Sequence, residues 1–426
     1  MIWLISGYLF LFIFRPFEYW PILGTLRIER VYMFLLLIAV FLNKEKRYIP
    51  HVINKATILF FFSIVVSGFF ALHGPDAYDQ TYEYFKLLVF YFIVILCIRD
   101  EVDLKHFLVA YIAIMFLYLW KSEWEFFVHD NYMWRMGIKR LKGIDITYGD
   151  PNYLAASVAY SLPFLWALFR CNFQEKFIRY LLIGYTVLAG VAIIYTGSRS
   201  GMVTSVFFLL LVWWGSQRKI RGMVLLVVAL AVGWTVMPAS YKERLETIVI
   251  DKSESEDAAE RAATASAKGR MEGFHQGIKV FQSYPVTGIG PGNIIYGWEG
   301  MERGPKTHNL YGILLGELGI IGGVTFAFLV VQILLANWRN LRTITGLLPR
   351  ADPLADAASP EIMQLQQLRF ITIACIQTIL LLLFNGNFGH NLYRYSWLWV
   401  GAITVLCSYF IWRRIEPKVD LWITQK

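Results

Sequence analysis

Charged residues are scarce in this chain of 426 residues. Asp, Glu, Lys and Arg together make up 17% of it and hydrophobic residues 57%, whereas soluble domains are about one quarter charged. The low charge content excludes an ordinary soluble domain. The apolar side chains form continuous runs rather than alternating patterns, and such runs cross a bilayer as helices. The sequence therefore predicts an integral membrane protein built of helices.

Cysteine and the common cofactor motifs are also scarce or missing. The chain has 4 cysteines, and none has the spacing of a CxxC motif or of a Cys/His zinc site, which argues against structural zinc and disulfides. There is no Walker motif, no glycine-rich nucleotide fingerprint and no paired-aspartate motif of sugar-nucleotide enzymes. We therefore expect no metal, no nucleotide and no other cofactor.

Twelve apolar runs are candidate membrane spans, and the first of them lacks the features of a cleaved signal peptide. The expected fold class is an all-α polytopic membrane protein. Residues 1–237 would hold the first nine spans, residues 238–307 a large outer loop with amphipathic helices, and residues 308–426 the last three spans. The runs cover residues 2–14, 31–42, 56–72, 85–98, 107–120, 153–169, 178–196, 202–214, 223–237, 309–335, 370–384 and 396–412.

Lysine and arginine in the short loops predict the orientation. Taken alternately from the loop after the second span, one set of loops with the C-terminal tail has about twice as many basic as acidic residues, and the other set is nearly neutral. Basic loops face the cytoplasm, so both termini are expected inside and the loop 238–307 outside. Topology thus accounts for the net charge of +9, and nucleic-acid binding is not indicated.

Arg199 lies in a short outer turn, Thr196–Gly201 (TGSRSG), between two spans. Gly197 and Gly201 would allow close backbone approach and unusual φ angles, and Ser200 could cap the following helix. An arginine here could bind a phosphate through two parallel hydrogen bonds. The alternative is an interfacial arginine without a ligand.

Arg270 is expected on the packing face of an outer helix, because helical periodicity groups it with Phe274, Ile278 and Phe281. An unpaired arginine on such a face would be costly. A phosphate ligand would compensate for that cost, and so would an ion pair with Glu246 or Glu272. The sequence alone leaves both alternatives open.

His308 precedes the apolar run that begins at Leu310 and is expected in the first turn of that helix. A helix N-terminus disfavours imidazolium, and a neutral imidazole can act as a general base; a histidine at the lipid interface is the alternative. Glu317, in the same run, is a candidate functional acid or a structural hydrogen-bonding group. The run also contains glycines suited to close helix packing, at positions Gly312, Gly316, Gly319, Gly322 and Gly323.

Taken together, these motifs resemble the O-antigen ligase family of bacteria. The most specific is His308–Asn309, followed after nine residues by a G-x-x-G from Gly319 to Gly322. The other motifs are Gly197–Gly201 (GSRSG), Lys268–Arg270 (KGR), Thr287–Asn293 (TGIGPGN) and Gly149–Tyr153 (GDPNY), the last of which also reads as a helix N-cap followed by proline.

The resemblance implies an inverting, metal-independent glycosyltransferase of the GT-C type in the bacterial inner membrane, with its active site on the periplasmic side. The donor would be a glycan on undecaprenyl diphosphate, and the expected acceptor is lipid A-core. Polymerase and protein O-oligosaccharyltransferase relatives use another glycan or a protein instead. A transporter of lipid-linked sugars is the alternative from another class, but it would predict inverted repeats or charged residues along the spans.

The resemblance also implies roles for individual residues. Arg199 and Arg270 would hold the diphosphate and neutralise the leaving group, and His308 would either activate the acceptor hydroxyl or stabilise the leaving group. The substrate-binding residues expected beside these three are Lys306, Asn309 and Glu317.

Overall fold

The computed structural model describes residues 1–135, 137–145, 149–171, 175–246, 258–305, 307–348 and 359–423. In these residues a helix corresponds to each of the twelve predicted spans, which confirms the fold class. These helices are α1 (Ile2–Phe14), α4 (Ile28–Leu42), α5 (Val52–Gly68), α6 (Gly74–Cys97), α7 (Glu101–Val128), α8 (Pro151–Arg170), α9 (Lys176–Tyr195), α10 (Arg199–Gly215), α11 (Lys219–Val236), α14 (Leu310–Leu347), α15 (Pro360–Asn385) and α16 (Tyr395–Ile423).

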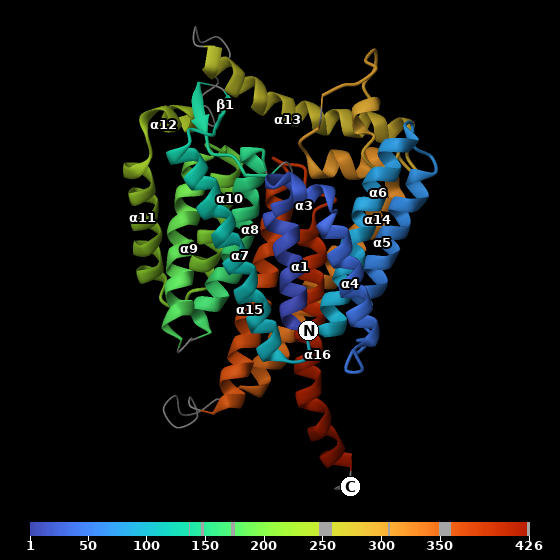
Figure 1. The fold of residues 1–426 in the computed structure, drawn as a ribbon, viewed down its shortest axis with the longest axis vertical. Coiled ribbons are helices and arrows are strands. Elements are labelled where there is room, and N and C mark those ends of the chain that lie inside the picture. Colours follow the sequence, from blue (N-terminus) through green and yellow to red (C-terminus); the bar gives the residue numbers. More distant parts are fainter. Residues whose placement is uncertain are drawn as a thin grey trace.

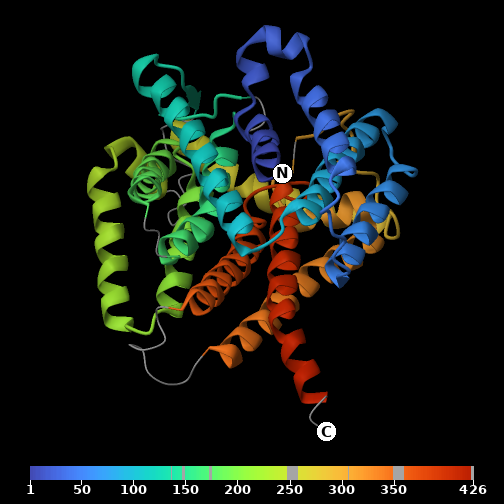
Figure 2. The ribbon, with the colours of Figure 1, turned by 60° about the horizontal axis from the view of Figure 1, so that its bottom comes forward.

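Eight of these helices are long and apolar enough to cross a membrane, and α1, α5 and α10 are shorter apolar helices. The helix α4, with 15 residues, is also short of a full span. Many apolar side chains of α11 are exposed, as is typical of a helix that faces lipid. This helix stands at the margin of the bundle (Figure 2), and its exposed residues include Val224, Leu225, Val227, Val228 and Val232.

Short elements cover one end of the bundle (Figure 1). They are α2 (Pro16–Tyr19), α3 (Pro21–Thr25), the antiparallel hairpin of β1 (Met133–Arg135) and β2 (Ile138–Arg140), α12 (Ala239–Glu246), α13 (Ala258–Ser283) and η1 (Ile294–Tyr296). We call this the capped end. The predicted division of the chain at residues 237 and 307 stays a prediction, and α12, α13 and η1 lie in the stretch between these positions.

Glycines let α13 pack closely against the start of α14. A Cβ atom at Gly277 would lie 2.4 Å from the Cα of Gly312, and one at Gly316 would lie 2.8 Å from a side-chain carbon of Ile294. The predicted small-residue packing is therefore confirmed at Gly312 and Gly316. The predicted apolar stripe of α13 is only half-buried, at Phe274, Ile278 and Phe281, whereas the buried face contains Gly273 and Gly277.

Substitution of Gly277 tests this contact. Gly277→Ala would place a methyl group against backbone atoms of Gly312, which cannot move aside as a flexible side chain can. We expect a loss of about 1–3 kcal/mol of stability, seen as a lower unfolding temperature of the purified protein in detergent. The matched control is Gly269→Ala on the same helix, where a Cβ would meet nothing within 4 Å. Equal unfolding temperatures for the two variants would contradict the close packing.

The helix α14 breaks at Gly319, so the prediction of one continuous span over residues 309–335 is wrong at this point. Gly319 has φ 60° and ψ −159°, a conformation open to glycine but not to other residues. The chain before α14 enters the break: the backbone N–H of Ile320 donates to Pro285 O (2.9 Å), and that of Ile321 donates to Val286 O (3.3 Å). The segment 310–318 consequently lies beside α13 at the capped end, and residues 320–347 continue along the bundle (Figure 1).

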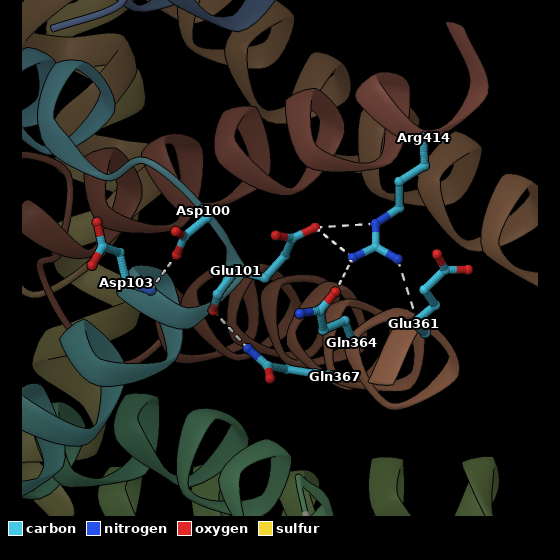
Figure 3. Close-up of polar contacts among 7 residues, drawn as sticks. All are labelled: Asp100, Glu101, Asp103, Glu361, Gln364, Gln367 and Arg414. Carbon is cyan, nitrogen blue, oxygen red and sulfur yellow. Dashed lines mark hydrogen bonds and ion pairs between the residues drawn. The ribbon is translucent and has the colours of Figure 1, made fainter. Parts of the chain in front are cut away.

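A polar network ties three helices together at the opposite end (Figure 3). The guanidinium of Arg414 on α16 donates to Glu101 Oε1 on α7 (2.8 Å) and to Gln364 Oε1 on α15 (2.5 Å). The side chain of Gln367 on α15 also donates to the backbone oxygen of Glu101 (2.8 Å). The side chain of Asp100 caps α7 by accepting from the backbone N–H of Asp103 (2.8 Å). These hydrogen bonds connect α7, α15 and α16 to one another at this end of the bundle.

Candidate active site

A small cavity lies at the capped end, where the hairpin, the starts of α8 and α10, α13 and the segment 386–394 converge. It encloses about 100 Å³, enough for several waters or a small anion. The lining residues are Arg135, Arg140, Asp150, Asn152, Tyr153, Ala156, Tyr160, Ser200, Arg270, His308, Asn385, Phe388, Gly389, His390, Asn391 and Arg394. We call it the cationic cavity.

The packing of α13 on α14 brings Arg270 and His308 to the same cavity. Gly273 lies so close to Thr307 that a Cβ there would be 2.9 Å from its methyl group. Arg270 is three residues before Gly273, about one helical turn along α13, and His308 directly follows Thr307, so both residues lie near this contact and both line the cavity. His308 is exposed and Arg270 half-buried. Two residues predicted from separate motifs therefore face one space.

His308 lies outside the helix that follows it. The N-cap of α14 is Asn309, whose side-chain oxygen accepts from the backbone N–H groups of Tyr311 and Gly312 (both 3.0 Å) and whose amide donates to Asn387 O (3.3 Å). The prediction that His308 sits in the first turn of this helix is wrong, because His308 is the residue before the N-cap. The side chain of Asn309 thus bonds to the backbone of α14 and of Asn387, and these hydrogen bonds fix the position of the adjacent His308. Lys306 lies outside the described residues.

Arg199 is at the start of α10 and is not among the lining residues of the cationic cavity, but its charge acts on Arg270. The helix is capped by Ser198, which accepts from the backbone N–H of Gly201 (3.2 Å), so the prediction of Ser200 as the cap is wrong. The predicted roles of the two glycines are confirmed: Gly197 has φ 57°, and a Cβ at Gly201 would lie 2.4 Å from the Cβ of Ala155. Arg199 is 5% exposed. Its neighbour Ser200 reaches the lining.

The electrostatics of the cavity are dominated by arginine. Burial lowers the pKa of Arg270 to about 10, the charge of Arg199 lowers it further, and Asp150 opposes this. Burial likewise lowers the pKa of Arg140 to about 10, again opposed by Asp150. Both guanidinium groups remain protonated at neutral pH. Among the lining residues, four arginines face a single acid, Asp150, so the cavity favours an anion.

Arg140 is held in place by neutral acceptors. Its Nε donates to Thr196 O (2.7 Å) and one Nη to Asn152 Oδ1 (2.9 Å), and its side chain is 1% exposed. Arg270 forms no ion pair with any side chain that the structure describes, Glu272 included, while the side chain of Glu246 lies outside that description. The ion pair with Glu272 is therefore not formed, and the ion pair with Glu246 and the anionic ligand stay predictions.

Glu317 is a structural centre next to the cavity rather than part of its lining. Its carboxylate accepts from the backbone N–H groups of Gly292 (2.9 Å) and Ile294 (3.0 Å) and from the hydroxyl of Tyr393 (2.6 Å). It lies two residues before the break in α14, near the capped end. Glu317 therefore fastens the turn at Thr287–Asn293 and the segment 386–394 to α14.

Several lining residues were not predicted from sequence. Arg135 and Arg140 come from the hairpin, and His390 and Arg394 from the segment 386–394. The guanidinium of Arg394 lies 4.1 Å from the centre of the Tyr153 ring. Neither segment shows a periodic pattern, and their positions depend on tertiary packing. The one available signal was GDPNY: the predicted N-cap at Asp150 with Pro151 behind it is confirmed, and Asp150 also lines the cavity.

The described residues include no group of three or more His, Cys, Asp or Glu side chains that could hold a metal ion. The ligand-binding capacity of the cavity comes from guanidinium, imidazole, amide and hydroxyl groups, with Asp150 as the single carboxylate. These groups can bind and polarise an oxyanion and can accept a proton from a nearby hydroxyl.

A polytopic helical membrane protein with a cationic cavity at one end is the class of molecule that the fold and the site define. Residues 184–327, about a third of the chain, match the family model described as O-Antigen ligase. The match confirms the resemblance predicted from the motifs: this chain carries an O-antigen ligase domain. No curated protein matches the chain. The matched segment includes Arg199, Arg270 and His308, whereas the hairpin and the segment 386–394 lie outside it.

The family that this segment matches indicates a membrane enzyme of glycosyl transfer, of ligase or polymerase type, acting on a lipid-linked glycan and a glycan acceptor.

Proposed function

We propose that this protein transfers a glycan from undecaprenyl diphosphate to a hydroxyl of lipid A-core, on the periplasmic side of a bacterial inner membrane. The observation that carries the proposal is the convergence of Arg270 and His308 on one arginine-rich cavity, beside buried Arg199. A lipid-linked diphosphate presents an anion at the membrane surface, and the cationic cavity lies at an end of the bundle where such a group would arrive.

In the proposed reaction, an acceptor hydroxyl oxygen forms a bond to the anomeric carbon of the donor. The bond between that carbon and the diphosphate oxygen breaks, and its electron pair leaves with the diphosphate. Attack from the face opposite the leaving group would invert the anomeric centre. His308 accepts the hydroxyl proton as general base, for which its exposure at the cavity wall is suited.

The arginines supply the charge that the leaving group requires. Arg270 would contact the diphosphate directly, since it lines the cavity, and the Arg199 charge would add to the field. Placing fixed positive charges where negative charge develops lowers the barrier, because no reorganisation is needed during the reaction. The like charges also repel one another, which lowers the pKa of Arg270, and a bound diphosphate would relieve that repulsion. Glu317 and Asn309 act as positioning residues in this proposal.

Purified protein tests the proposal when it is supplied with undecaprenyl-diphosphate-linked glycan and three acceptors: lipid A-core, a second lipid-linked glycan and a Ser/Thr peptide. We expect transfer to lipid A-core. The rate is expected to remain unchanged in excess EDTA, because arginine charge and not a metal neutralises the leaving group. Transfer to another acceptor would replace the ligase assignment with that of a polymerase or protein transferase. A chelator effect restored by added metal would contradict the arginine mechanism.

A further inference from the structure

A second cavity adjoins the cationic cavity on the far side of Arg394. It encloses about 440 Å³ between α1, α4, α6 and the start of α16. Tyr153, His390 and Arg394 line both cavities. The stacked pair of Arg394 and Tyr153, 4.1 Å apart, thus forms part of a shared wall. We call this second space the aromatic chamber.

The chemical character of the aromatic chamber differs from that of the cationic cavity. Rings of Tyr8, Phe12 and Phe90 form one side of it, and the rings of Tyr8 and Phe90 are 5.0 Å apart. Tyr395 closes another side, with its ring 5.4 Å from that of Phe12 in an edge-to-face arrangement. Such surfaces offer flat apolar contact area with polar hydroxyl groups at their edges.

Charged groups of both signs complete the lining. They are Arg15, Glu29, Glu83, Lys86 and Arg394. Two of the bases are already paired, Arg15 with Glu18 at 2.5 Å and Lys86 with Glu83 at 2.6 Å. The chamber therefore has no surplus charge comparable with the four arginines of the cationic cavity, and a second diphosphate is not the ligand that it favours. An alkyl chain is equally disfavoured, because it would desolvate these charges.

A neutral ligand with many hydroxyl groups fits both features. Carboxylates accept hydrogen bonds from hydroxyls, Lys and Arg donate to them, and aromatic faces cover the apolar faces of a sugar ring. Such a mixture of apolar walls with a few polar groups that set orientation is typical of small-ligand sites.

The position of the chamber agrees with this chemistry. Arg15 follows the last residue of α1, Glu29 is in the first turn of α4, and Glu83 and Lys86 are near the middle of α6. The chamber and the cationic cavity lie side by side, because they share three lining residues. A ligand in the chamber can therefore reach the cavity past His390 and Arg394.

We propose that the aromatic chamber binds the saccharide part of the acceptor and directs its reacting hydroxyl past Arg394 towards His308. This inference rests on the proposed function and deepens it. Donor and acceptor would then occupy opposite sides of the wall formed by Arg394 and Tyr153, the diphosphate among the arginines and the acceptor sugar among the rings. Phe12 and Glu83 are specificity-determining residues on the acceptor side.

Measuring the binding of each ligand in the absence of glycan transfer tests the two sites separately. Purified protein in nanodiscs is titrated with two probes, lipid A-core oligosaccharide and undecaprenyl diphosphate, for wild type and three variants. Phe12→Ala and Glu83→Gln are each expected to weaken oligosaccharide binding about tenfold and to leave undecaprenyl diphosphate binding unchanged. Arg270→Ala is expected to show the reverse pattern.

Matched controls exclude general effects on the fold. Phe10→Ala changes a half-buried phenylalanine of α1 that does not line the chamber and stacks on Phe14 at 5.0 Å. Asp79→Asn changes an exposed acid of α6, one turn before Glu83, that is also outside the lining. Both controls are expected to bind both probes as wild type does.

The possible outcomes distinguish the inference from the proposed function. The inference is overturned when wild type fails to bind the oligosaccharide, when Phe12→Ala and Glu83→Gln bind it as wild type does, or when these variants lose undecaprenyl diphosphate instead. A wild-type protein that binds the oligosaccharide in the chamber but not undecaprenyl diphosphate supports the chamber and counts against the proposed donor.

Discussion

Replacing His308 with alanine is expected to lower the rate of glycan transfer by about 10²- to 10⁴-fold, the usual contribution of a general base. The protein should stay folded and inserted, because His308 is exposed and the cap of α14 is made by Asn309. Donor binding should change little, since the arginines supply it. The measurement is the initial rate of transfer by purified protein at saturating donor and acceptor, with the unfolding temperature in detergent as the check on folding.

The matched control for this experiment is His275→Ala. His275 is an exposed histidine of α13 that does not line the cationic cavity, so its loss should leave the rate of transfer unchanged. Normal transfer by His308→Ala would rule out the imidazole as the base. Equal losses in both variants would point to a general effect of histidine replacement on the capped end of the bundle.

Arg270→Ala is expected to reduce transfer by at least about 10²-fold, the usual cost of removing one group that stabilises developing negative charge. Arg270→Lys should recover only part of the rate, because an ammonium cannot make the two parallel hydrogen bonds of a guanidinium. Stability should not fall with activity: Arg270 is half-buried and is repelled by Arg199, so removing its charge is expected to leave the unfolding temperature unchanged or raise it.

The measurements are transfer rate, undecaprenyl diphosphate binding and unfolding temperature for each variant, with Lys279→Ala on the exposed face of α13 as control. Arg199→Ala is expected to lose transfer as well, and the double variant should lose less than the sum of the single losses in free energy, because the two charges act on one ligand. A lower unfolding temperature for Arg270→Ala with normal transfer would assign this arginine to the fold instead of the site.

The sequence was most informative where a physical requirement is local. Runs of apolar residues predicted the helices that cross the membrane, because a backbone in hydrocarbon must satisfy its own hydrogen bonds. The cap at Asp150, the unusual φ of Gly197 and the suitability of Gly312 and Gly316 for close packing could also be predicted, since each depends on a few neighbouring residues, whereas α13 as the packing partner could not. Arg270 and His308 could be identified as candidates because each belongs to a short sequence motif that resembles the family.

Other features depended on contacts between distant segments. The break at Gly319 follows from residues 284–288 entering α14, and no periodicity of α14 itself reveals it. The carboxylate of Glu317 looked like an isolated acid within a span until Tyr393 and the backbone of Gly292 and Ile294 were seen to bind it. Ser198 and Ser200 are equivalent candidates for a cap by composition, and the path of the turn selects between them.

The sequence by itself indicated a helical membrane protein that resembles the O-antigen ligase family, and it singled out Arg199, Arg270 and His308 as candidate site residues. Only the tertiary structure decided that Arg135, Arg140, His390 and Arg394 line the same cavity and that an aromatic chamber adjoins it. The physical reason is that helix formation and capping depend on near neighbours, whereas a binding site is formed by side chains whose positions are set by packing between helices far apart in the chain.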